Sequence, residues 1–112
     1  MTFNVVLTRR AETDIDGILS WLRDRSPQGA EAWYRVWTEV LGKLREHASA
    51  YGLAPENADH EHEIRHVVFK TRRGGRYRAV FAIRSRDVLV LHVRRPGQDV
   101  VGPNELEVPE AT

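Results

Sequence analysis

A group of two imidazoles and four cations, with side chains suited to acting on a phosphate, is predicted to share one face of a β-sheet. Side chains alternate between the two faces of a strand, so their positions can be sorted by parity. The group faces away from the aromatic residues of the same strands. Its members are His66, Lys70, Arg76, Arg78, His92 and Arg94.

Such a surface suits cleavage of RNA by its own 2′-hydroxyl group. That reaction needs a base for the hydroxyl proton, cations for the charge on the phosphate and an acid for the leaving oxygen. An arginine suits the phosphate because it stays charged and its forked donors match phosphate oxygens. His66 or His92 could exchange a proton near neutral pH, and Lys70 could do so only with a depressed pKa. Taken singly, each histidine is more simply a hydrogen-bonded or solvated spectator.

The basic residues are concentrated in one part of the chain. Residues 62–98 hold ten Lys or Arg against two acids, whereas the rest holds seven basic and 14 acidic side chains. The net charge of the 112-residue chain is therefore only +1. This segregation favours a polyanionic partner, although a block of charge is often just a solvated surface.

Composition excludes several classes of protein. There is no Cys, so a disulfide framework, a thiol nucleophile and a cysteine zinc site are all excluded. No apolar run has the length of a bilayer span, and we expect a cytoplasmic protein without a membrane partner. The histidines and the acid of residues 60–66 lack a standard ligand spacing, so we expect no metal and no cofactor.

The periodicity predicts an α+β domain over residues 1–98 and an irregular acidic tail over residues 99–112. A strand at 2–8 precedes helices at 9–25 and 27–48, which form an antiparallel hairpin because only a short turn joins them. Strands at 64–71, 76–84 and 88–94 follow as an antiparallel meander. The hairpin should cover the face that carries Val67, Phe69, Tyr77, Ala79, Phe81, Ile83, Leu89, Leu91 and Val93.

Several short motifs occur in an order that resembles a known family. They are LTRRAETDI at 7–15, Trp21-Leu22, Ser26-Pro27, IRH at 64–66, KTRRGGRYRAVF at 70–81 and VLHVRRPGQ at 90–98. Together they resemble the RelE/ParE superfamily of bacterial toxins from type II toxin–antitoxin, or plasmid stabilisation, modules. The likeness covers residues 3–98.

The resemblance implies a small toxin neutralised by a cognate antitoxin, whose disordered C-terminal part folds across it. RelE-like members cleave messenger RNA in the ribosomal A site, and ParE-like members inhibit DNA gyrase without known hydrolysis. Arg78 matches the family arginine that stabilises the cleaved phosphate, and Lys70 lies near a strand lysine used there. RelE-like enzymes often have an Arg and a Tyr after the last strand, but here the last tyrosine is Tyr77. His92 would have to take the acid/base role of the missing C-terminal tyrosine.

From these observations we favour ribosome-dependent cleavage of messenger RNA by a metal-independent endoribonuclease. Its catalytic residues would be Arg78, Lys70 and His92, and its RNA-binding residues would be Arg76, Arg94, His66 and Arg73. Gyrase inhibition is the alternative, toward which the long helical hairpin also points. A further alternative is an inactive nucleic-acid-binding relative. Trp33 and Trp37 belong on the inward helical stripe, and an exposed part of them would form the antitoxin-binding groove.

Overall fold

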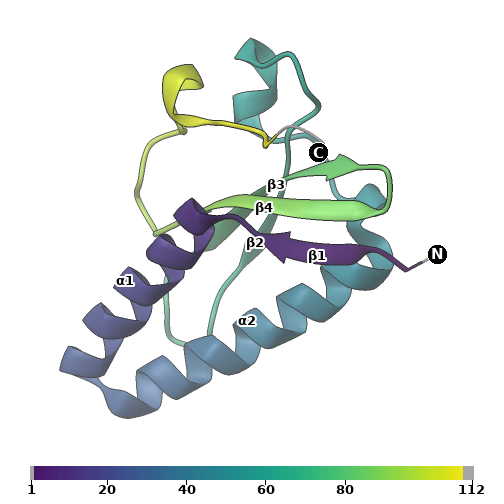
Figure 1. Ribbon diagram of the computed structural model, residues 1–112. Helices are drawn as coiled ribbons and strands as arrows, with labels where there is room; N and C mark the ends of the chain where they lie inside the picture. The colour runs from purple at the N-terminus through teal and green to yellow at the C-terminus, as the bar shows by residue number, and fades with distance from the viewer. Residues whose placement is uncertain (1, 110–112) are drawn as a thin grey trace.

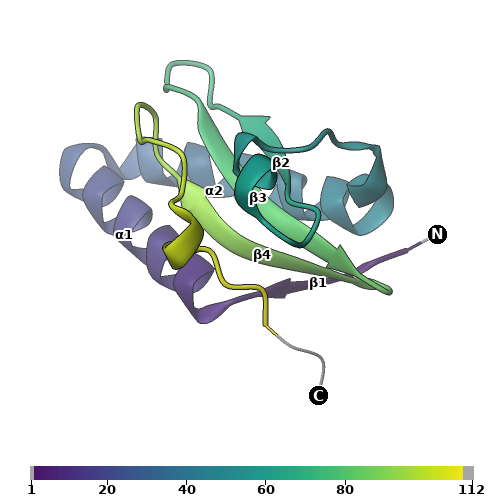
Figure 2. The same ribbon diagram turned by 90° about the horizontal axis from the view of Figure 1, so that it is seen from above.

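The computed structural model describes residues 2–109, in which a helical hairpin packs on one face of a four-stranded sheet (Figure 1). The elements follow the order β1 (Asn4–Leu7), α1 (Arg9–Arg25), α2 (Pro27–His47), β2 (Arg65–Phe69), β3 (Tyr77–Arg84) and β4 (Asp87–Arg94). Two short 3₁₀ helices, Pro55–Asp59 and Pro103–Glu105, lie over the opposite face of the sheet (Figure 2). This architecture confirms the predicted fold class.

The sheet has the strand order β1-β4-β3-β2. Strands β2, β3 and β4 form the predicted antiparallel meander, and β1 lies parallel to β4 with Asn4 opposite Asp87 and Leu7 opposite Val90. Parallel neighbours need a long connection, and here the helical hairpin and two strands separate β1 from β4 in the chain. The N-terminal strand thus forms one edge of the sheet and β2 forms the other.

The predicted caps fix the ends of both helices. The Thr8 hydroxyl accepts a hydrogen bond from the Ala11 N–H at the start of α1. Ser26 acts at the turn of the hairpin: its N–H donates to the Leu22 carbonyl, and its hydroxyl accepts from the Gly29 N–H at the start of α2. Within residues 2–109, neither helix is long and apolar enough to cross a membrane.

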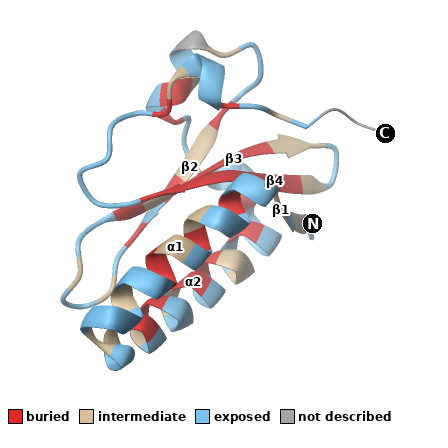
Figure 3. Cartoon of the chain, turned by 60° about the vertical axis from the view of Figure 1, so that its left-hand side comes forward, coloured by how far each residue is buried: buried red, intermediate tan, exposed pale blue. Residues whose placement is uncertain are grey.

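The main core lies between the hairpin and the sheet, where both helices turn their buried stripes toward the strands (Figure 3). Trp33 stacks on Trp37 with ring centroids 5.9 Å apart, and Phe69 and Tyr77 pack against Trp33 from the sheet. Both indoles are almost completely buried. Burying a large aromatic side chain stabilises a fold by a few kcal/mol, so this cluster is the main reason the hairpin stays on the sheet.

For the first half of β4, the prediction of which side chains point toward the helical hairpin is wrong. Phe81 pairs with Val90 and Val80 pairs with His92, so β4 carries one extra residue, Leu91, at a β-bulge. The strand therefore presents Val88, Val90 and Val93 to the hairpin, whereas we expected Leu89, Leu91 and Val93. Alternation could not settle this because both faces of β4 are apolar.

A second core explains why both faces are apolar. Leu89 and Leu91 belong to a cluster on the side of the sheet away from the hairpin, together with Ala54, Ile64, Val80, Ala82, Val101 and Leu106. The segment around Pro55–Asp59 and the chain after β4 supply the cover (Figure 2). We expected this face to be open and basic, and that expectation is wrong because residues 101–108 pack onto it.

Candidate functional site

Arg78 is engaged in an ion pair with the buried carboxylate of Glu56. Its Nη1 donates to Oε1 of Glu56 over 2.9 Å, and its Nη2 donates to Oε2 over 2.7 Å. The Glu56 side chain is 0% exposed and that of Arg78 is 18% exposed. The guanidinium group that sequence analysis assigned to an RNA phosphate therefore already holds a carboxylate in the geometry it would use for a phosphate.

Glu56 also joins the loop before β2 to the C-terminal segment. Its Oε2 accepts a hydrogen bond from the Val101 N–H over 3.0 Å. Burial alone would raise the pKa of this carboxyl group, but the hydrogen bonds from Arg78 and Val101 and the charge of Arg78 lower the pKa to about 2. Glu56 is therefore ionised at neutral pH and connects three segments of the chain. The sequence gives no signal for Glu56 as a site residue, because Glu56 lies in a loop with no apolar period.

His66 lies on the other side of Arg78. The Arg78 Nη1 atom is 3.2 Å from Nδ1 of His66, and because a guanidinium group can only donate, Nδ1 must be the accepting nitrogen. Burial and the neighbouring charge of Arg78 lower the pKa of His66, against an opposing effect of Glu56. His66 and Arg78 thus lie on the same face of the sheet, as parity predicted, and the His66 ring is neutral in this arrangement.

His92 is buried beneath the C-terminal segment, with 2% of it exposed. Its Nε2 lies 3.0 Å from the Glu105 carbonyl oxygen and therefore donates to it, and its Nδ1 faces Oδ2 of Asp14 at 3.8 Å. Asp14 also accepts from the Val93 N–H at the bulge and from Arg10. Burial is the main reason that the pKa of His92 is lowered. In this position His92 connects the sheet to the tail through its hydrogen bond to the Glu105 carbonyl.

The remaining predicted catalytic and RNA-binding residues divide into two groups. Arg94 lies opposite Arg78 in the sheet register, is 9% exposed and donates to the Asp99 carbonyl oxygen. Lys70, Arg73 and Arg76 are exposed at the turn between β2 and β3. The sheet therefore brings His66, Arg78, His92 and Arg94 to one face, as parity predicted, but the tail covers that face and the turn residues lie outside it.

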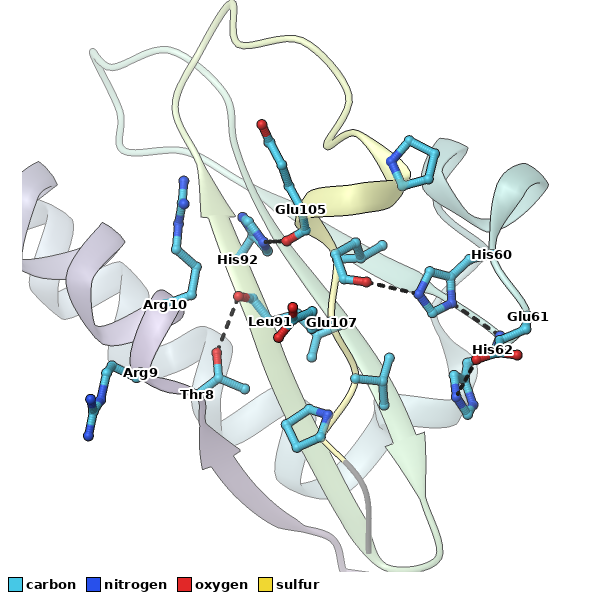
Figure 4. Close-up of a pocket in the computed structure, with 14 residues that line it drawn as sticks. Thr8, Arg9, Arg10, His60, Glu61, His62, Leu91, His92, Glu105 and Glu107 are labelled. Atoms are coloured by element: carbon cyan, nitrogen blue, oxygen red, sulfur yellow. Dashed lines mark hydrogen bonds and ion pairs between the residues drawn. The ribbon is translucent and has the colours of Figure 1, made fainter.

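A cavity of about 990 Å³ opens beside His92, between the start of α1, the loop before β2 and the tail (Figure 4). Arg9 and Arg10 line one side, and the tail residues Glu105 and Glu107 line another. His60 closes the far end, because its Nε2 donates to the Leu106 carbonyl oxygen and its Nδ1 accepts from the His62 N–H. Both ring nitrogens of His60 are therefore engaged with backbone groups. Among the side chains described in residues 2–58 and 60–109, no group of three or more His, Cys, Asp or Glu is arranged to hold a metal ion.

Trp33 and Trp37 lie inside the main core, with 1% and 2% exposed. They cannot contact a partner unless the core opens. The aromatic side chains that the helices do expose are Trp21 in α1, 44% exposed, and Tyr34 in α2, 53% exposed. A partner that docks on the hairpin would meet these two residues.

Comparison with known proteins agrees with the fold. The sequence model of a family described as the ParE toxin of the type II toxin–antitoxin system parDE matches residues 5–100. A chain from the chromosomal ParDE TA system of P. aeruginosa has a similar structure, with a TM-score of 0.62 at 19% sequence identity. The similarity covers 85% of this chain and 97% of that chain. A comparison with curated proteins gives no match.

Proposed function

Because the chain belongs to the ParE family of toxins from type II toxin–antitoxin systems, we propose that it arrests bacterial growth by inhibiting DNA gyrase. A cognate antitoxin would neutralise it. This proposal differs in its mode of action from the one that the sequence favoured. The sequence alone favoured ribosome-dependent cleavage of messenger RNA, and the ParE match favours the alternative.

The observation that carries this proposal is the ion pair between Arg78 and Glu56. Cleavage of RNA requires a cation that is free to meet the charge developing on the phosphate. Both terminal nitrogens of Arg78 donate to the Glu56 carboxylate, which is inaccessible to solvent. An incoming phosphate would have to replace a charge-assisted, two-point contact that also holds the tail. Arg78 is therefore better suited to a structural role.

The proton-transfer groups also fit cleavage poorly. His92 is buried with Nε2 donating to a backbone carbonyl, so it cannot approach a 2′-hydroxyl without displacing the tail. His66 uses Nδ1 to accept from Arg78. No tyrosine follows Tyr77 in the sequence. Inhibition of gyrase requires binding and no proton transfer, so it makes no demand on these groups.

The matched test uses a double variant, Glu56→Gln/Arg78→Met. Arg78→Ala alone is ambiguous because it leaves a buried carboxylate without its partner, which by itself can unfold the protein. The double change removes both charges at similar side-chain volume, and such replacements are often close to neutral for stability. After induction in bacteria, we expect wild type and the double variant to arrest growth equally, with intact messages and a DNA-damage response.

One result would restore the enzymatic hypothesis. The wild type would cleave translated messages at codons after induction, and the double variant would lose this cleavage although its thermal unfolding is unchanged. Absence of growth arrest by soluble wild-type protein would contradict a toxin of either kind and would favour the inactive nucleic-acid-binding relative.

A further inference from the structure

An apolar groove of about 400 Å³ lies between the second half of α1 and the turn that leads into β3. Ile18, Trp21 and Leu22 line it from the helix, and the opposite wall consists of Gly74, Gly75, Tyr77, Arg95 and Pro96. Most side chains of the groove are apolar, and Trp21 is 44% exposed. An exposed indole beside other apolar groups is unfavourable in water and is typical of an interaction site.

Close packing of the turn shapes the far wall. A Cβ atom on Gly75 would lie 2.7 Å from Cγ of Pro96, so only glycine lets the turn approach the end of β4 this closely. The groove is therefore bounded on one side by α1 and on the other by a turn that packs against Pro96.

The rim of the groove is made of arginines. The guanidinium group of Arg25 lies 3.8 Å above the ring centre of Trp21, and Arg95 lines the wall itself. Arg73 and Arg76 flank the two glycines of the turn and are exposed. Among the side chains that the structure describes, which leave out that of Asp59, no carboxylate lies within ion-pair distance of these four guanidinium groups. Their charges are available to a partner.

The charge and shape of this site fit an acidic peptide better than a nucleic acid. Single-stranded nucleic acids stack their bases on open aromatic faces. Here Arg25 already covers one face of Trp21, and the groove has room for a side chain between α1 and the wall formed by the turn and Pro96. Carboxylates on either side of that side chain would meet the arginine rim and would bring the partner in by electrostatic attraction.

We propose that this groove binds an acidic peptide segment of a partner protein, with one large apolar side chain of the segment inserted beside Trp21. The inference rests on the proposed function only for the source of the segment, since a toxin of this family has a cognate antitoxin. The binding itself is measured without gyrase, so its failure and the failure of gyrase inhibition are separate results.

The probe is a fluorescein-labelled peptide of glutamates around a single leucine, and binding is followed by fluorescence anisotropy with the full chain. We expect saturable binding that weakens about tenfold in Trp21→Ala and in Arg73→Glu. Arg86→Glu is the matched control, because Arg86 is exposed at the opposite end of β3. The Arg86→Glu variant should bind the peptide as tightly as the wild type does. Unchanged thermal unfolding shows that each variant is folded.

Two comparison probes decide the chemistry. The same peptide with alanine in place of leucine should bind about tenfold more weakly. Equal affinities of the alanine and leucine peptides would contradict an apolar anchor. A labelled single-stranded DNA that binds more tightly than the peptide, and loses that binding in Trp21→Ala, would overturn the assignment in favour of a nucleic-acid site. Absence of peptide binding would also overturn it.

Discussion

The buried carboxylate of Glu56 takes up the charge of Arg78 on a surface that is otherwise basic. It occupies the position beside Arg78 that a phosphate would need, and it holds Val101 of the tail at the same time. Parity along β3 was sufficient to place Arg78 on this face. The partner could not be predicted, because Glu56 is 22 residues away in a loop where local spacing carries no information about contacts.

The ion pair leads to a first prediction about stability. Glu56→Gln should lower the free energy of unfolding by about 3 kcal/mol, because it leaves the half-buried Arg78 without a charged partner. Unfolding in guanidinium chloride measures this. Glu63→Gln is the matched control, since Glu63 contacts Arg65 but is 73% exposed, and we expect a change within about 0.5 kcal/mol. Equal effects of the two substitutions would contradict the importance assigned to Glu56.

The same residue predicts a pH dependence. Folding lowers the pKa of Glu56 from 4.5 to about 2, so its contribution to stability is complete above pH 4.5 and is lost as the pH falls toward 2. The stability difference between wild type and Glu56→Gln should therefore shrink across this range, from about 3 kcal/mol to near zero. Guanidinium unfolding of both proteins at a series of pH values tests this. A difference that stays constant down to pH 2 would contradict the lowered pKa.

At the scale of elements, the helices and most strands could be predicted because their signals are local. Thr8 and Ser26 cap the helices where expected, and Pro27 begins α2. The facing of β4 could not be predicted, since a strand covered on both sides has no polar face to define its phase. The bulge at Leu91 then shifts the alternation halfway along the strand.

The tail is the element whose role the sequence concealed. Its prolines, glycine and acids predicted irregular structure, yet Val101 and Leu106 are each 3% exposed in the second core. Backbone carbonyls of the tail accept from His60, His92 and Arg94. Irregular backbone can therefore pack as firmly as a helix when neighbouring side chains satisfy its polar groups.

This packing leads to a prediction for the tail. Leu106→Ala should lower the free energy of unfolding by about 2 kcal/mol, because it removes buried apolar volume over Leu89 and Leu91. Val100→Ala is the control, since Val100 is 51% exposed, and it should change stability little. Thermal unfolding of both variants measures the difference. If Leu106→Ala is as stable as Val100→Ala, the tail does not form part of the core.

At the scale of the whole molecule, the structure reduces the exposed part of the basic charge. Residues 62–98 hold ten Lys or Arg, but Arg65 and Arg78 pair with carboxylates and Arg94 is buried beneath the tail. Most of the cations that remain open lie at the turn between β2 and β3, beside the groove lined by Trp21, whereas Arg86 is exposed at the opposite end of β3. Charge segregation therefore indicates where a partner docks more clearly than it indicates a catalytic face.

The measurement that tests the proposed function most directly is supercoiling of relaxed plasmid by purified DNA gyrase with ATP in the presence of the purified chain. We predict that the wild type abolishes supercoiling and that Glu56→Gln/Arg78→Met does so equally, because the two charges are engaged with each other within the fold. Undiminished supercoiling with the chain in large molar excess over gyrase would contradict the account.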